Sequence, residues 1–412
     1  MPSKLARLSL LALVCLAIGC RSRSTGNDVP LTKGPPPTAQ EVQAFADSLE
    51  QAALVDGRMD FAGHIDWIAL VDQAMRDAGM ADSGRNGRIA LRSSAAEKAK
   101  ASFTQTLNKT LIPGAKYKLL RIGRAADGLP LCTFRMTLPD AGGLNYHDLK
   151  LSRSLDGGIR AVDFLEYVSG DPMTLTLSRM FLLVKSEAQN PADPDSFLAH
   201  AGKLQRMKAL SNLGKAAEVI QVFETLPPKV RTIKPILILR LAAAMELGDD
   251  VALKAIEEYR AAFPGDAASD LISIDMFVLK KNFDEALACL DRIDAKIGGD
   301  PYLDVLRAIL KLEEGDTSSA RAVADRAVAR NPDEEDAHIA RLSLSLKGKR
   351  HADTLEDLRQ FERRFGIGNF AAVDEYAEFL KSPEYREWIM LHPFAKEKTA
   401  DGAGDSFQPE GR

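Results

Sequence analysis

The side chains that could do chemistry are scattered along this sequence of 412 residues. Its six histidines include no pair at metal-ligand spacing with a nearby carboxylate, as zinc-binding helices have. The sequence also has no phosphate-binding glycine loop followed by lysine and no serine nucleophile elbow. We therefore expect a protein that is not an enzyme and that holds neither a metal nor a cofactor.

Two residues, His147 and Asp163, are weak candidates for lining a pocket or exchanging a proton. Both lie in strand-like segments. Tyr146 directly precedes His147, and adjacent residues of a strand point to opposite faces, so these two cannot both line one pocket. The alternative interpretation is that Asp163 faces solvent or completes a turn and that none of these residues is functional.

A third chemical signal is Cys20, which follows an apolar segment. Two basic residues precede the apolar run 8–18, which has the length of a signal-peptide core but is too short to span a bilayer stably. The segment ending in Gly19-Cys20 resembles a bacterial lipoprotein signal. This resemblance implies cleavage after Gly19, so that 1–19 is the signal peptide, and attachment of acyl chains such as palmitate to Cys20. The alternative is an ordinary secretory leader that is cut nearby.

Acylation would decide where the protein resides. Each buried methylene contributes about 0.8 kcal/mol, so a multiply acylated cysteine would hold an otherwise soluble protein on a membrane. We expect a cell-envelope location facing the periplasm, and the outer membrane rather than the inner one, because Arg21 and Ser22 follow the cysteine. The polar segments 20–38 and 394–412 cannot bury enough surface to fold, and they are interpreted as a tether and a tail.

Composition limits the kind of partner. The 54 lysines and arginines are interspersed with 58 aspartates and glutamates, and the net charge is −4, so a nucleic-acid partner is not expected. Outside the leader region the only cysteines are Cys132 and Cys289, which fall in different predicted domains. We expect buried free thiols rather than a disulfide, since bridging requires close Cα atoms.

Residues 39–190 predict an α+β domain. Helical patterns come first, and then the hydrophobic period changes from 3.6 to 2. Four strand-like runs follow at 117–122, 131–138, 144–151 and 159–167, and their short connections favour an antiparallel meander. This order, helices and then a curved antiparallel sheet, resembles the nuclear transport factor 2-like and cystatin-like folds. The resemblance implies an apolar pocket between helix and sheet.

Residues 193–390 carry a repeat of 34 residues. Small residues recur at this interval, and helix breakers stand twelve positions after each of them. The small residues are Ala252, Ala286, Ala320 and Thr354, and the breakers are Pro264, Gly298, Pro332 and Gly366. The pattern resembles tetratricopeptide repeats, which implies an all-α solenoid with a terminal cap. A non-repetitive helical bundle, the alternative, would not keep the breakers in phase.

In this repeat register an apolar stripe lines the concave face, which suggests an interface. The candidate groove residues are Leu237, Leu241, Leu271, Val278, Val305, Ile309, Leu312 and Ile339. A register error of one residue would instead place them in the core between helices. The leading hypothesis is a membrane-anchored, non-catalytic adaptor that binds a protein partner or apolar peptide segment. The alternative hypothesis is a carrier or sensor with a small apolar ligand or lipid in the α+β domain.

Overall fold

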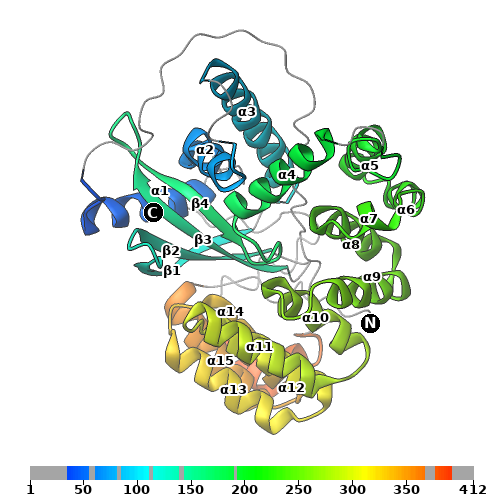
Figure 1. Cartoon of the computed structure of the whole chain (residues 1–412). Coiled ribbons are helices and arrows are strands. Elements are labelled where there is room, and N and C mark those ends of the chain that lie inside the picture. The colour runs from blue at the N-terminus through cyan, green and yellow to red at the C-terminus, as the bar shows by residue number, and fades with distance from the viewer. Residues whose placement is uncertain are drawn as a thin grey trace. The chain divides into compact units, whose positions relative to one another are not determined.

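The structure is a computed structural model that describes residues 35–54, 61–80, 85–110, 115–138, 143–189, 193–366 and 376–391 (Figure 1). The predicted signal segment, with Gly19 and Cys20, lies outside the described residues, as do most of the tether and the tail 394–412. The chain divides into two compact units, Met1–Lys280 and Lys281–Arg412, and each is described by itself.

A four-stranded antiparallel sheet with the strand order β1-β2-β3-β4 is at the centre of the first unit. The strands are β1 (Lys116–Arg124), β2 (Pro130–Thr137), β3 (Leu144–Arg153) and β4 (Ile159–Glu166). Each strand pairs with the next, so that Phe134 lies opposite His147 and Leu149 lies opposite Phe164. The predicted meander is confirmed, because turns this short join only antiparallel neighbours.

Helices pack on this sheet and enclose its core. They are α1 (Ala39–Leu54), the short 3-10 helix η1 (Phe61–His64), α2 (Trp67–Asp77), α3 (Arg85–Thr110) and α4 (Met173–Ala188). Figure 1 shows α2 and α4 beside β4. The buried cluster includes Phe61 from η1, Phe103 from α3 and Phe164 from β4. The apolar faces of the helices and the inward-facing residues of the strands therefore form one core.

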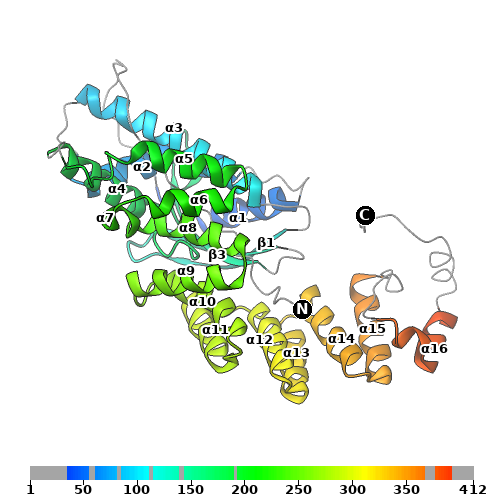
Figure 2. The ribbon, with the colours of Figure 1, turned by 90° about the vertical axis from the view of Figure 1, so that its right-hand side faces the viewer.

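Six further helices belong to this first unit. They are α5 (Ala201–Asn212), α6 (Ala216–Glu224), α7 (Pro228–Arg231), α8 (Lys234–Leu247), α9 (Asp249–Ala262) and α10 (Ala267–Leu279). Figure 2 shows α5, α6 and α8 in successive rows. The predicted domain boundary near residue 190 marks the change from sheet to repeat helices, whereas the contacts divide the chain after Lys280.

A buried ion-pair cluster joins the sheet region to these helices. The Lys234 Nζ lies 2.9 Å from Asp171, which precedes α4, and 2.6 Å from Asp266, which caps α10. Tyr259 donates its hydroxyl to Asp266 at 3.1 Å. Because the Lys234 side chain is only 8% exposed, these contacts are shielded from solvent and hold residues distant in sequence together.

The second unit is a run of helices joined by short turns. They are α11 (Phe283–Ile297), α12 (Tyr302–Glu314), α13 (Thr317–Arg330), α14 (Glu335–Lys347), α15 (His351–Phe365), the 3-10 helix η4 (Phe379–Lys381) and α16 (Pro383–Leu391). Helices α12 and α13 pack together, and so do α14 and α15. The expected sheet domain followed by helical repeats is confirmed.

The 34-residue period corresponds to one pair of helices. Its small residues are all buried and lie in α9, α11, α13 and α15, and each of these helices ends just before the expected breaker. At Gly298 the chain adopts a left-handed conformation with φ 81°, which a residue without Cβ adopts freely. The repeat phase therefore follows from close helix approach at one position and helix termination at another.

The end of the helical run is closed by a small apolar cluster. Phe379 and Trp388 pack against buried leucines of α14 and α15. The Ser382 Oγ accepts a hydrogen bond from the Tyr385 backbone N–H at 3.1 Å, so it caps α16 as the Ser-Pro sequence indicates. This cluster thus covers the last pair of repeat helices, which is where a terminal cap of a repeat stack lies.

Two other expectations are tested by the described residues. Cys132 and Cys289 are both buried free thiols, as we expected. Within the described part of the chain, no helix combines the length and the apolar character that crossing a membrane would require.

Candidate binding site

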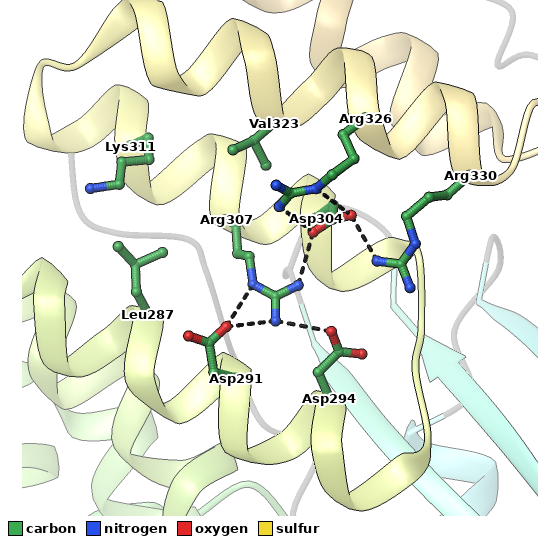
Figure 3. Close-up of a pocket in the computed structure, with 9 residues that line it drawn as sticks. All are labelled: Leu287, Asp291, Asp294, Asp304, Arg307, Lys311, Val323, Arg326 and Arg330. Atoms are coloured by element: carbon green, nitrogen blue, oxygen red, sulfur yellow. Dashed lines mark hydrogen bonds and ion pairs between the residues drawn. The ribbon is translucent and has the colours of Figure 1, made fainter.

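A pocket of about 440 Å³ opens in the second unit between α11 and α13, with α12 as its floor. Short connections position these three helices. Gly298 ends α11, and Gly315 ends α12 in a left-handed conformation with φ 94°. Asp316 then caps α13 by accepting a hydrogen bond from the Ser319 N–H at 3.0 Å. Each turn reverses the chain within a few residues, so the three helices lie side by side (Figure 3).

Charged side chains line most of this pocket. The residues are Leu287, Asp291, Asp294, Asp304, Arg307, Lys311, Val323, Arg326 and Arg330. Only Leu287 and Val323 are apolar, and both lie toward the Lys311 end (Figure 3). Pockets for small ligands are mostly apolar with a few polar groups. This lining instead suits a polar or charged segment.

The buried carboxylate of Asp304 organises the pocket. It is 0% exposed, and three guanidinium groups surround it. Arg307 and Arg330 each approach it at 2.9 Å, and Arg326 contacts both carboxylate oxygens, at 2.9 and 3.2 Å. Charge-assisted hydrogen bonds of this kind fix the orientation of a guanidinium plane. Asp304 therefore holds three arginine side chains from two helices in defined positions.

Arg307 is bound on its other side by α11. Its guanidinium group donates to Asp291 at 2.8 and 3.1 Å and to Asp294 at 3.0 Å. Asp294 also accepts a hydrogen bond from the Asp300 N–H at 2.8 Å, which fixes the turn before α12. Figure 3 shows Arg307 in the middle of the pocket, between these two aspartates and Asp304. Its donors are thus engaged by carboxylates of this unit.

The charged groups of the pocket are held in their ionised forms. Burial opposes ionisation of Asp304, but hydrogen bonds from Arg326 and Arg330 outweigh it and lower the pKa of the carboxyl. Burial likewise works against the Arg307 cation, yet its bonds to Asp291 and Asp294 raise the pKa. A general acid or base needs a pKa near the working pH. These groups stay charged at neutral pH, so they are suited to holding a charged ligand.

The same kind of ion pair returns one repeat later. Arg307 pairs with Asp291 at 2.8 Å, and 34 positions on, Arg341 lies 3.8 Å from Asp325. Arg341 also pairs with the buried Asp357 at 3.0 Å. The sequence analysis followed only the small residues and breakers, and it missed these pairs. A search for opposite charges at the 34-residue period could have found them.

The eight predicted groove residues have different environments. Five are buried: Leu237, Leu241, Leu271, Val278 and Val305. Ile309 and Leu312 are half-buried and pack against apolar residues of neighbouring helices. Ile339 is 44% exposed. Neighbouring residues therefore cover seven of the eight wholly or in part, and the pocket described above is lined by charged rather than apolar side chains.

His147 lies in a closed polar cluster inside the first unit. The Asn145 Oδ1 accepts hydrogen bonds from two backbone N–H groups, so its Nδ2 is the donor to His147 Nε2 at 3.3 Å and to Glu166 at 3.1 Å. This arrangement leaves His147 Nδ1 as the donor to the Tyr117 hydroxyl at 3.1 Å. Burial lowers the pKa of His147 to about 3 and raises that of Glu166 well above its usual value. Burial thus disfavours the charged form of both groups, and aromatic rings lie beside the imidazole.

Asp163 is not part of this cluster. It pairs across the sheet with Lys150, whereas His147 pairs with Glu166. The Asp163 carboxylate accepts hydrogen bonds from the backbone N–H and the hydroxyl of Thr174, at 3.0 and 2.6 Å. Because Thr174 lies in the first turn of α4, Asp163 satisfies a free donor at the start of that helix. The structure thus keeps the two predicted pocket residues apart.

Among the residues that the structure describes, no group of three or more His, Cys, Asp or Glu side chains is arranged to hold a metal ion. Comparison of the chain with models of protein families gives no match. Comparison with curated proteins finds no similar sequence. The functional argument therefore depends on the geometry of the site.

Proposed function

We propose that this protein is a non-catalytic adaptor of the bacterial cell envelope, anchored to a membrane by acyl chains at Cys20, whose helical repeats bind a protein partner. The observation that carries the proposal is the pocket between α11 and α13, where fixed charges face open space on a repeat scaffold. Stacked helical repeats present extended surfaces of this kind to partners. The repeats are assigned to the tetratricopeptide type on their 34-residue period.

The membrane anchor is proposed from the leader. An apolar run with a basic start and a Gly19-Cys20 end supports acylation, cleavage and a periplasm-facing location, with the outer membrane favoured. Anchoring would confine the adaptor to a surface and raise the effective concentration of a partner held there.

The carrier alternative would require an apolar cavity in the α+β domain, which is assigned to the nuclear transport factor 2-like class on the order of its elements. Aromatic side chains fill that interior instead. The rings of Phe103 and Phe164 have centroids 5.1 Å apart, and Phe61 lies 5.4 and 6.1 Å from them. Rings at such distances are in contact. This packing favours the adaptor over the carrier.

Photo-crosslinking in the native membrane tests the proposal. A photoreactive benzoylphenylalanine is introduced at Leu287 in the pocket, and in a second variant at Leu213, which is 71% exposed on the other unit. We expect irradiation to join a second protein to the Leu287 variant and not to the Leu213 variant. Crosslinks of equal pattern from both positions, or none from Leu287, would contradict the proposed binding surface.

A membrane-fractionation arm tests the anchor. In the Cys20→Ser variant no acyl chain can be attached, so we expect the acyl mass to be lost and any protein whose leader has been removed to move from the membrane pellet to the soluble fraction. A variant without its leader that stays in the pellet would rule out Cys20 as the anchor.

A further inference from the structure

We propose that the partner presents an acidic segment and that Arg326 and Arg330 bind one of its side-chain carboxylates. This inference rests on the proposed function, since it names the chemistry that the same pocket would recognise. The two arginines are four residues apart on α13, so they lie on the same face of the helix. Figure 3 shows both guanidinium groups directed toward Asp304 at one end of the pocket.

The charges at this end are not balanced. Among the residues that the structure describes, Asp304 is the only ion-pair partner within 4 Å of either arginine, and it is shared with Arg307. Arg307 in turn has Asp291 and Asp294 on its far side. The Asp304 carboxylate therefore pairs with the guanidinium groups of both Arg326 and Arg330 in addition to that of Arg307. The three arginines and three aspartates of the cluster balance as a whole, but the positive charge of Arg326 and Arg330 lies toward α13, where an anion would be attracted.

The same two arginines are accessible and already oriented. Their side chains are 54% and 40% exposed, whereas the Asp304 carboxylate is 1% exposed. A ligand can therefore approach the outer N–H groups without displacing Asp304. Holding a long side chain still normally costs entropy on binding, and the ion pair with Asp304 has already reduced that freedom. Arg326 gives its Nε and one Nη to Asp304, whereas Arg330 gives one Nη. Arg330 therefore keeps the Nε/Nη2 fork that a carboxylate accepts, and Arg326 adds its second Nη.

The rest of the lining restricts how an acidic segment would lie. Asp291, 69% exposed at the α11 rim, would repel a carboxylate, so the acidic side chain must lie toward α13. Leu287 and Val323 lie toward the other end of the pocket beside Lys311 (Figure 3). An apolar side chain next to the acidic one would contact this pair. We therefore assign the pocket to a segment in which an acidic residue neighbours an apolar one.

A fluorescein-labelled hexaglutamate peptide is the probe, and fluorescence anisotropy of the full chain is the measurement. The test variant is Arg326→Gln/Arg330→Gln. The matched control is Arg359→Gln/Arg363→Gln, which removes two arginines at the same spacing from α15 of the same unit, each with its own glutamate partner. We expect saturable binding that weakens at least tenfold in the test variant and less than twofold in the control.

Other outcomes would overturn the inference. These are no binding of hexaglutamate by the native chain, equal weakening in both double variants, or equal binding of hexaglutamine. Stronger competition by inorganic phosphate than by hexaglutamate would assign the site to a phosphoryl group instead. Arg330→Lys keeps the charge without the fork and should retain binding in part. Arg330→Lys also replaces the double variant as the test variant if thermal unfolding shows that the double variant has not folded.

The failure of this inference differs from the failure of the proposed function. If the crosslink from Leu287 persists in the Arg326→Gln/Arg330→Gln variant, a protein partner binds there but not through these arginines. If no crosslink forms in the native chain, the adaptor proposal itself is contradicted.

Discussion

Asp304 is the residue on which the geometry of the pocket depends, because it pairs with three arginines from a fully buried position. The Asp304→Asn variant keeps the shape of the side chain but leaves the guanidinium groups facing one another. Removing one partner of a buried ion pair typically costs about 3 kcal/mol. We expect the free energy of unfolding of the second unit to fall by about this amount, as measured by urea denaturation.

The control for this change is Asp333→Asn, since Asp333 pairs with Arg364 at 2.9 Å but its side chain is 78% exposed. An exposed pair contributes at most about 1 kcal/mol.

Hydrogen bonds lower the pKa of Asp304 in the folded state, so its contribution to stability is present above the unfolded pKa and is lost as the pH falls. The difference between native chain and Asp304→Asn should therefore narrow in acid. Equal stability of the two at neutral pH would contradict this role.

The stability of the first unit should also depend on pH, and here the cause is the burial of His147. Burial lowers its folded pKa to about 3, while an exposed histidine titrates near 6.5. Between these values the unfolded state binds the additional proton, so stability falls as the pH falls, by at most about 1.4 kcal/mol per pH unit. In His147→Gln this part of the pH dependence should disappear from urea denaturation curves recorded between pH 7 and pH 5.

A comparison variant makes this test specific. His200→Gln retains His147 and should keep the native pH dependence. Burial raises the pKa of Glu166, so the unfolded state loses this proton at a lower pH than the folded state does. The contribution of Glu166 to stability therefore falls as the pH rises, which is opposite to that of His147. Glu166 remains in both variants, so the comparison between them reports the loss of the His147 imidazole. An unchanged slope in His147→Gln would show that the buried imidazole does not control the acid response.

At the residue scale, the sequence analysis named none of the residues that line the pocket. It named His147 and Asp163 separately, but pairing across the sheet brings Glu166 to His147 and carries Asp163 to the start of α4. The arginines of the pocket come from α12 and α13 and meet one carboxylate. Such convergence depends on tertiary contacts, which a pattern of residue types along the chain does not contain.

At the scale of elements, Gly170 in the turn between β4 and α4 permits a close approach. Its φ is +74°, and a Cβ there would collide with the Asp266 Oδ1 and lie 2.8 Å from the Lys234 Nζ. We expect Gly170→Ala to disrupt the buried ion-pair cluster and to lower stability by about 2 kcal/mol beyond the backbone strain of the substitution. Thermal or urea unfolding of the full chain measures this difference.

Gly128 provides the matched control. Its φ is +83°, nearly the same as that of Gly170, but nothing lies within 4 Å of a Cβ added there. Gly128→Ala should therefore show the backbone strain alone, about 1 kcal/mol. If both variants lose the same stability, the close packing at Gly170 does not contribute.

Elements were predictable where their signals are local. The alternation of side chains and the turn residues placed all four strands, and the breakers in phase placed the helix ends. The orientation of each repeat helix was not predictable in this way. A shift of one residue rotates a helical position by about 100°. The pattern alone therefore does not decide whether residues such as Leu241 and Val305, which are buried, face a groove or a neighbouring helix.

At the scale of the whole molecule, the chain joins two kinds of structure within its first compact unit. Helices of repeat type belong to the same unit as the sheet, and the contact between Lys234 and Asp171 links residues 63 positions apart. The sequence-based boundary near residue 190 follows the change in element type, which composition and periodicity reveal. The division after Lys280 follows from contacts between residues that are distant in sequence, which composition and periodicity do not reveal.

Native mass spectrometry of the lipidated chain, gently extracted from its own membrane, tests the central claim most directly. We predict a complex whose additional mass is a polypeptide, and we predict that this mass is lost in Arg326→Gln/Arg330→Gln and retained in Arg359→Gln/Arg363→Gln. A bound small molecule, released on denaturation and unaffected by either pair of substitutions, would contradict the adaptor account and support a carrier.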